Sequence, residues 1–202
     1  KRLLEVGCGS GHSLVWQAKH GAGELWGLDI SESQLRNASR WLAENGVEAH
    51  LVCSPMEEPC GIPEGYFDYV YSIYALGWST DLHCTFRRLA AYLKPGGTLI
   101  FSWNHPLYGR AGCVHVQGDR LVFDKSYFDR RDTEFTFDDG VLYLRNYSIS
   151  DYVNALADAG FAIERLVEQT DAETLAASGD LTDKVRQAQM HPLSFVFKAR
   201  KL

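Results

Sequence analysis

The stretch Leu3-Leu4-Glu5-Val6-Gly7-Cys8-Gly9-Ser10-Gly11 decides the fold of this chain. An apolar run reaches an acidic residue, a glycine-rich turn follows, and a helical pattern then runs from Ser13 to about His20. This order predicts a strand, a tight loop and a helix. Glycine suits a loop whose backbone takes positive φ or approaches a ligand closely, and the helix start behind the loop offers unpaired N–H groups.

A second apolar run, from Leu25 to Leu28, ends at Asp29. A carboxylate about 20 residues beyond a glycine loop, at the end of the next strand, is placed to accept hydrogen bonds from both hydroxyls of a ribose. The glycines follow the spacing G-x-G-x-G, which is shorter than the G-x-G-x-x-G of dinucleotide-binding loops. The loop and Asp29 together predict a ligand that contains a nucleoside.

Four motifs in this order resemble those of the class I S-adenosylmethionine (SAM) dependent methyltransferases. They are LLEVGCGSG from Leu3, GLDIS ending at Ser31, FDYVYSIYAL from Phe67 to Leu76, and LKPGGTLIFSW from Leu93 to Trp103. The resemblance is to the small-molecule branch, which includes enzymes of the ubiquinone-biosynthesis type and methyltransferase type 11 domains. It implies SAM as the cofactor, S-adenosyl-L-homocysteine as the product, and a small molecule as the methyl acceptor.

The resemblance, together with the alternation of strand and helix signals, predicts a single α/β domain over residues 1–202. The expected fold is Rossmann-like, with a doubly wound seven-stranded sheet that is mostly parallel, a last strand that is antiparallel, and helices on both faces. Family members usually carry one or two helices before the first strand, so the resemblance implies that such helices are missing from this chain. The expected strands are 2–6, 24–29, 49–53, 67–73, 98–103, one that starts after Gly160-Phe161, and 193–198; the expected helices are 13–20, 31–45, 82–93 and 151–159.

Residues 104–147 interrupt this alternation. Segments 114–117, 120–123, 134–137 and 141–145 have strand character, and Gly118-Asp119 and Asp138-Asp139-Gly140 between them predict hairpins. The segment is rich in aromatic residues and follows the fifth strand, whose carboxyl end is where doubly wound folds bind ligands. We interpret it as a lid over the acceptor pocket. A structural hairpin that covers an edge strand is the alternative.

The resemblance implies that the first loop holds the methionine part of SAM. Gly7, Gly9 and Gly11, with Cys8 among them, let the backbone pass close to this part of the cofactor. Glu5 reaches the amino group of SAM through water. The alternative for Glu5 is a carboxylate at a strand end that is bound to backbone N–H groups.

The second and third strands are expected to hold the nucleoside part. Asp29 binds the ribose hydroxyls, and Ile30 lies against the adenine. A helix N-cap is the alternative for Asp29, but Ser31, with Gln34 three residues further on, already forms a capping box.

Many relatives carry an aspartate after the third strand that meets the adenine amino group, whereas this chain has Ser54-Pro55-Met56 there. Ser54 stands at the position of the acid and offers one hydroxyl, and Met56 packs on the purine. Glu57 is a weaker candidate replacement, and an exposed carboxylate is its alternative role. Ser72, at the end of the fourth strand, is expected to offer its carbonyl to the SAM ammonium.

The methyl-acceptor pocket is expected at the ends of strands four and five. Tyr74, Trp78, Trp103, His105 and Tyr108 lie there, and their aromatic rings suit an apolar or aromatic small molecule. His105 is the candidate general base, because histidine titrates near neutrality. A histidine in a His-Pro turn, hydrogen-bonded to the backbone, is the alternative. Methyl transfer from a sulfonium depends mainly on alignment, so a proximity mechanism without a base is also open.

Composition excludes several other functions. The net charge of −6 argues against a nucleic-acid substrate, because phosphate binding needs a basic surface. The five cysteines form no CxxC pair, which predicts a reducing cytoplasmic location without a disulfide framework or a metal site. No apolar run approaches the ~20 residues of a membrane-spanning helix. We expect a monomer or homodimer.

Two rival functions stay open at this point. One is a SAM-binding regulatory protein without catalysis, because binding and turnover use the same loop. The other is a nicotinamide-dependent Rossmann oxidoreductase, against which the shortened glycine loop and the Pro95-Gly96-Gly97 turn argue.

Overall fold

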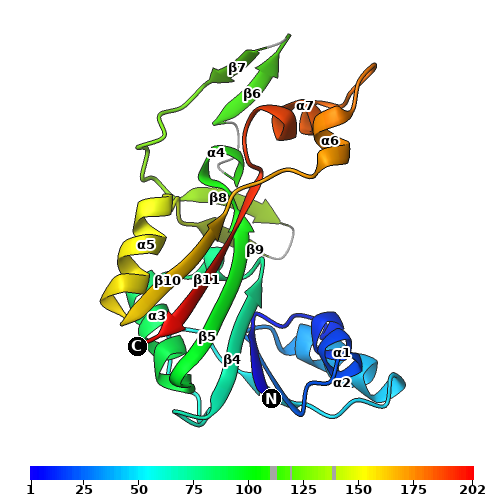
Figure 1. The fold of residues 1–202 in the computed structure, drawn as a ribbon, viewed down its shortest axis with the longest axis vertical. Helices are drawn as coiled ribbons and strands as arrows, with labels where there is room; N and C mark the ends of the chain where they lie inside the picture. Colours follow the sequence, from blue (N-terminus) through cyan, green and yellow to red (C-terminus); the bar gives the residue numbers. More distant parts are fainter. Residues whose placement is uncertain (110–112, 119, 138–139) are drawn as a thin grey trace.

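The computed structural model describes residues 1–109, 113–118, 120–137 and 140–202. Its body is a seven-stranded sheet (Figure 1). The strand order is β10 (Phe161–Val167), β11 (Ser194–Lys201), β5 (Leu93–Asn104), β4 (Phe67–Ile73), β1 (Arg2–Val6), β2 (Glu24–Asp29) and β3 (His50–Cys53). Neighbours from β5 to β3 pair in parallel, whereas β11 is antiparallel to both β5 and β10. The predicted doubly wound sheet with a reversed last strand is confirmed.

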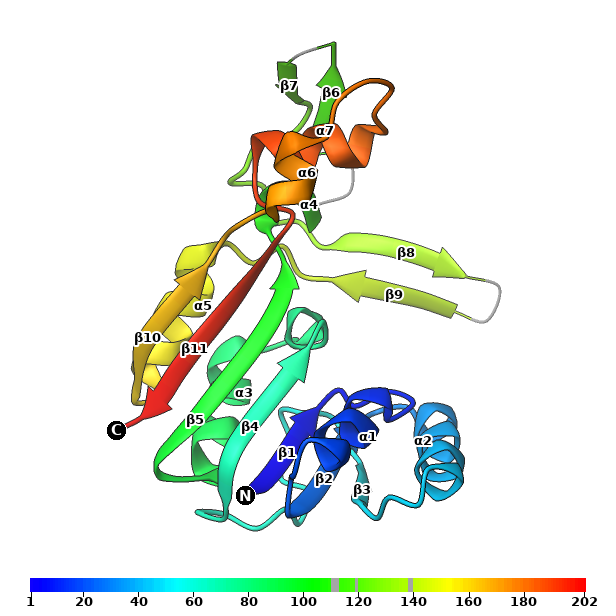
Figure 2. The ribbon, with the colours of Figure 1, turned by 45° about the vertical axis from the view of Figure 1, so that its right-hand side comes forward.

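Helices cover the two faces of the sheet in two groups (Figure 2). Helices α1 (His12–Lys19) and α2 (Glu32–Glu44) pack beside β1, β2 and β3, whereas α3 (Leu82–Tyr92) and α5 (Ile149–Asp158) pack beside β4, β5 and β10. The side chains of β1 point alternately toward one group of helices and toward the other, because successive residues of a strand face opposite sides of the sheet. Leu3 joins the cluster under α1 and α2, whereas Leu4 and Val6 join the larger cluster under α3 and α5.

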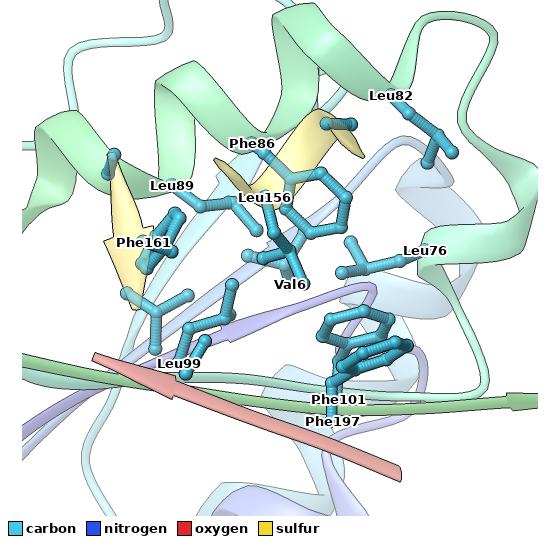
Figure 3. Close-up of a cluster of buried hydrophobic side chains, with 14 of the residues drawn as sticks. Val6, Leu76, Leu82, Phe86, Leu89, Leu99, Phe101, Leu156, Phe161 and Phe197 are labelled. Carbon is cyan, nitrogen blue, oxygen red and sulfur yellow. The ribbon is translucent and has the colours of Figure 1, made fainter. Parts of the chain in front are cut away.

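The larger cluster is the main core of the protein (Figure 3). Phe86 from α3, Phe101 from β5 and Phe197 from β11 are almost completely buried in it. The rings of Phe101 and Phe197 are stacked, with centroids 5.3 Å apart. Each such side chain stabilises the fold by about 1.5–3 kcal/mol relative to an exposed position. This core fixes the carboxyl ends of β4 and β5, where the acceptor pocket is expected.

The structure differs from the expected boundaries at β5, which begins at Leu93 and runs through Pro95-Gly96-Gly97. Leu93 pairs with Phe67, and the register then shifts before Thr98 pairs with Tyr69. The Pro-Gly-Gly segment is therefore a bulge within the strand, where a separate turn was expected.

The insertion after β5 starts with the short helix α4 (Pro106–Gly109) and contains two antiparallel hairpins, as predicted. Strands β6 (Val114–Gln117) and β7 (Arg120–Phe123) form the first, and β8 (Thr133–Phe137) and β9 (Gly140–Leu144) form the second. Of the residues expected to form the turns, 119, 138 and 139 lie outside the described residues. In Figure 2 the β8–β9 hairpin projects sideways from the carboxyl end of the sheet.

Two short helices between β10 and β11 were not predicted. They are α6 (Ala172–Ala176) and α7 (Asp183–Met190), and neither buries a residue completely, so no apolar periodicity marks them. Their N-caps are regular: the side chain of Asp171 accepts from the Thr174 N–H, and that of Thr182 accepts from the Val185 N–H. The capping residues Asp171 and Thr182 were the features of the sequence from which these two helices could have been predicted. Across the described ranges, no helix has the length and apolarity needed to cross a membrane.

Candidate active site

The glycine loop between β1 and α1 takes the conformation that its sequence predicts. Gly7, Gly9 and Gly11 have φ values of 73°, 51° and 76°, a region that glycine enters without steric cost. The Gly7 N–H donates to the Leu28 carbonyl at 2.7 Å. A Cβ on Gly7 would lie 2.1 Å from the Cβ of Ala75, so no larger residue fits there without displacement.

Asp29 ties the end of β2 to this loop. Its Oδ2 accepts from the Gly9 N–H at 2.8 Å, and its Oδ1 accepts from the Ser31 N–H at 2.9 Å. Ser31 is the N-cap of α2 and accepts from the Gln34 N–H, so the cap position is filled as expected and Asp29 is not the cap. The expected capping box is incomplete, because the Ser31 N–H donates to Asp29 and the Gln34 side chain accepts from the Ser10 hydroxyl at 2.6 Å. Each carboxylate oxygen keeps capacity for a further hydrogen bond, which a ribose hydroxyl can use.

A cavity of about 450 Å³ opens beside the loop, a volume within the range of small-molecule sites. It brings together seven residues that the sequence analysis assigned to the site: Gly7, Asp29, Ile30, Ser54, Pro55, Met56 and Trp78. Leu28, Glu57, Glu58, Ala75 and Thr80 complete its lining. The predicted nucleoside-binding residues of two separate segments therefore meet Gly7 and Trp78 at one place.

Glu57 has a more defined position than the exposed carboxylate considered from the sequence. It is half-buried, and its Oε1 accepts from the N–H of Thr80 at 2.7 Å and from its hydroxyl at 3.2 Å. Glu57 therefore connects the segment after β3 to the segment after the short 3₁₀ helix η1 (Leu76–Trp78). Both segments line the cavity, so this contact joins two parts of its wall.

Glu5 lies behind the loop and is not among the residues that line the cavity. Its side chain is buried, with 2% of the residue exposed, and its Oε2 accepts from the hydroxyl of Tyr71 at 3.2 Å. Ser13, in the first turn of α1, donates in turn to the Tyr71 oxygen at 3.2 Å. Burial raises the pKa of Glu5 to about 8, although the hydrogen bond from Tyr71 partly opposes this rise. Neither Tyr71 nor Ser13 was predicted as a site residue.

Cys8 and Ser72 are buried next to the site but are not among its lining residues. Burial, with the nearby carboxyls of Glu5 and Asp29, raises the pKa of the Cys8 thiol to about 12. A thiol with so high a pKa is unreactive near neutrality. Ser72 pairs with Phe101 of β5 inside the sheet.

Three of the predicted acceptor-side residues form an aromatic cluster at the ends of β4 and β5. The ring of Trp103 lies 5.8 Å from that of Trp78 and 6.3 Å from that of Tyr74. A Cβ on Gly77 would overlap the indole of Trp103, which therefore packs directly on the η1 backbone. Tyr74 has a φ of 52°, a strained value for a residue with a side chain, and such strain concentrates at functional sites.

The second hairpin of the insertion contacts this aromatic cluster. Phe135 of β8 lies with its ring 6.3 Å from that of Trp78, in an edge-to-face arrangement. The hydroxyl of Tyr147, just after β9, donates to the Ser79 carbonyl at 3.2 Å. The β8–β9 hairpin is therefore fixed to the wall of the cavity, whereas β6 contacts α7.

His105 does not line the cavity. It is 6% exposed; its Nδ1 accepts from the Leu107 N–H at 3.2 Å, and its Nε2 lies 2.9 Å from Oε1 of Glu168. The backbone bond leaves Nδ1 without a proton, so Nε2 donates to Glu168 and no ring nitrogen has a free lone pair. Burial lowers the pKa of His105, and Glu168 opposes this. Tyr108 donates its N–H to the His105 carbonyl and also lies outside the cavity lining.

Comparisons with known proteins identify related methyltransferases. The family model described as a methyltransferase domain matches residues 4–101. A ubiquinone biosynthesis O-methyltransferase from Bordetella avium is 34% identical over 102 residues, which are 50% of this chain and 42% of that protein. A malonyl-[acyl-carrier protein] O-methyltransferase from Methylovorus sp. is 29% identical over 170 residues, which are 71% of this chain and 57% of that protein. This chain thus spans about half the length of the curated relatives it matches.

The fold comparison extends beyond the first half of the chain. The crystal structure of an S-adenosylmethionine dependent methyltransferase from Mesorhizobium loti superposes with a TM-score of 0.81 at 26% identity. The match covers 99% of this chain and 90% of that one, so it includes the insertion after β5. Residues 4–101 therefore belong to a methyltransferase-domain family, the whole chain has the fold of the class I SAM-dependent methyltransferases, and S-adenosyl-L-methionine is its cofactor.

Proposed function

We propose that this protein transfers the methyl group of SAM to an oxygen, nitrogen or carbon atom of a small-molecule acceptor. The observation that carries the proposal is the cavity in which Gly7 and Asp29 meet Trp78, whose ring also contacts Trp103 of the aromatic cluster. One side has the donors and acceptors that suit a nucleoside and an amino acid. The other side has the apolar surface that suits an organic acceptor.

The cofactor supplies an activated methyl group on a sulfonium, so the task of the protein is alignment. The glycine loop presents its backbone to the methionine part, and Asp29 fixes the ribose. Ile30, Ser54 and Met56 enclose the adenine. Ser72 was predicted to offer its carbonyl to the cofactor ammonium, and this stays a prediction.

We assign the β8–β9 hairpin to the acceptor side. Register places Phe135 opposite Leu142 on the same face of this hairpin, and Phe135 contacts Trp78. A lid with this apolar face would exclude water from the sulfonium and from an apolar acceptor. The contacts with Trp78 and Ser79 support the lid interpretation over a hairpin that only covers an edge strand.

The function needs no protein base, and the geometry of His105 supports this version of the mechanism. Both ring nitrogens are engaged, so base catalysis by His105 would first require the pair with Glu168 to separate. We expect His105→Ala to lower turnover by less than about tenfold, against the 10²–10⁴-fold loss typical of a removed general base. Single-turnover kinetics between pH 6 and 9 measure this. A loss above a hundredfold, together with a lost ascending limb, would restore His105 as the base.

Asp29 gives the direct test of the cofactor site. Asp29→Asn keeps the side-chain shape but removes the charge from hydrogen bonds to the ribose, which we expect to weaken SAM and S-adenosylhomocysteine binding by about 1.5–3 kcal/mol. Calorimetry measures the affinity, and Asp171→Asn, at the remote N-cap of α6, is the control. Unchanged affinity in Asp29→Asn would remove the ribose assignment.

Activity is tested by following S-adenosylhomocysteine formation with a panel of phenols, amines and carbon acids. Tight SAM binding without turnover on any acceptor would favour the non-catalytic regulatory alternative, and NAD binding in its place would favour an oxidoreductase. We propose a reducing, cytoplasmic location for the reaction, because the five cysteines form no CxxC pair.

A further inference from the structure

A chain of hydrogen bonds, buried at Glu5 and Tyr71, lies directly behind the cofactor loop. Glu5 of β1 pairs in register with Gly27 of β2 on one side and with Tyr71 of β4 on the other. Residues in register on neighbouring strands share a face of the sheet, so the carboxyl of Glu5 and the ring of Tyr71 lie next to each other. Gly27 has no side chain, and Cys8 and Leu14 fill the space that a Cβ there would need.

The hydrogen bonds run from the helix toward the acid. Tyr71 donates its single hydroxyl proton to Glu5, and its oxygen accepts from Ser13. Ser13 stands in the first turn of α1, directly after the glycine loop. The chain Ser13–Tyr71–Glu5 therefore links the start of the helix to the acid that precedes Gly7.

We propose that Tyr71 is a positioning residue for the cofactor: through its hydrogen bond it holds Glu5 as a group that releases a proton when SAM binds. The inference rests on the cofactor site proposed above. It goes beyond that site because it couples SAM affinity to pH through two residues that do not line the cavity.

Electrostatics explains the coupling. The groups that face Glu5 are Tyr71 from β4, Ser13 from α1, Asp29 from the end of β2 and the thiol of Cys8 from the loop. None of these is a cation, so burial dominates and the pKa of Glu5 is about 8. The carboxyl is therefore mostly protonated at pH 7 without ligand.

SAM carries a cationic ammonium and a cationic sulfonium. Glu5 precedes Gly7 by two residues, so a cation bound at this loop would lie near Glu5 and lower its pKa, because an opposite charge favours the ionised form. Glu5 then loses its proton, which goes to the solvent buffer. The Tyr71 hydroxyl stabilises the carboxylate that remains, because hydrogen bonds to an ionised group are stronger than those to a neutral one.

The test is calorimetry of SAM binding at pH 7 in two buffers of different ionisation enthalpy, which counts protons released per SAM. We expect about 0.5–1 proton for the unmodified protein, since most Glu5 is protonated beforehand. Glu5→Gln should release none. Release that persists in Glu5→Gln would overturn the proposal, because the proton would then come from another group.

Tyr71→Phe separates positioning from a purely structural role. We expect the affinity for SAM at pH 7 to fall about 3–10-fold, because the Glu5 carboxylate loses the hydrogen bond from Tyr71. The midpoint of the rise of SAM affinity with pH should move to a higher pH for the same reason. Tyr69→Phe is the matched control: Tyr69 lies two residues earlier on the same strand, is partly exposed, and makes no described hydrogen bond to Glu5. Thermal unfolding of both variants tests whether they fold.

Two results would contradict the role of Tyr71. One is an unchanged pH profile in Tyr71→Phe, and the other is an equal shift in Tyr69→Phe. A failure of the proposed cofactor site is distinguishable from both, because the unmodified protein would then bind no SAM in either buffer.

Discussion

Replacing Gly7 by alanine is expected to lower the free energy of unfolding by about 2–5 kcal/mol, the combined cost of left-handed backbone strain and overpacking. The added Cβ would lie 2.1 Å from the Cβ of Ala75, a distance that real side chains do not reach. The backbone of β1 and the start of η1 must then separate. Because Gly7 and Ala75 both line the cavity, SAM binding should fall below detection in the same variant.

Gly9→Ala is the matched control for this experiment. Gly9 also has positive φ, but the nearest heavy atom to its added Cβ, Oε1 of Gln34, is 4.0 Å away. Only the backbone strain of about 1–2 kcal/mol applies there. Urea denaturation measures the free energy of unfolding of both variants. Equal losses in Gly7→Ala and Gly9→Ala would show that backbone strain, and not the contact with Ala75, accounts for the effect.

The parts of the site that were predicted from the sequence depend on local signals. The Gly7 loop could be predicted from its glycine spacing, because its positive φ values favour glycine over other residues. Asp29 was found because it ends an apolar run, and Ser31 because a cap and its partner Gln34 lie within one turn. Strand and helix positions followed from the same short-range patterns, and the doubly wound, mostly parallel sheet followed from the family motifs.

The parts that were missed join residues far apart in the chain. Tyr71 and Glu5 are separated by 66 positions, and His105 and Glu168 by 63. No periodicity connects such pairs, since they meet only after the strands have taken their places in the sheet. The same holds for Tyr147 and Ser79, which fix the hairpin to the cavity wall. His105 shows the consequence: its residue type suggested a base, but its partners depend on the segment after β10.

Glu5→Gln is expected to change how stability depends on pH, in the protein without ligand. The pKa of Glu5 is about 8 in the folded state and near its ordinary value of 4.5 in the unfolded chain. Between these values the unfolded chain has lost the proton that the folded protein retains. Stability therefore falls as pH rises through this window, and the fall ends once the pH passes the folded-state value.

The size of this effect follows from linkage. One proton held only by the folded state changes the unfolding free energy by about 1.4 kcal/mol per pH unit, so Glu5 alone should account for about 3–4 kcal/mol between pH 5 and 8. Glutamine is a neutral isostere of the protonated acid, and its amide oxygen still accepts from Tyr71. Glu5→Gln should therefore resemble the unmodified protein near pH 5 and become the more stable of the two by that amount near pH 8.

Glu24→Gln provides the control for this measurement. The pKa of Glu24 is lowered, first by the hydrogen bond from the Trp26 indole, so its carboxyl is ionised in both states throughout this window. Its replacement should shift stability by the same amount at every pH from 5 to 8. Urea denaturation across that range measures all three proteins. A constant difference between Glu5→Gln and the unmodified protein would mean that Glu5 is already ionised in the folded state, and the proton released on SAM binding would then need another source.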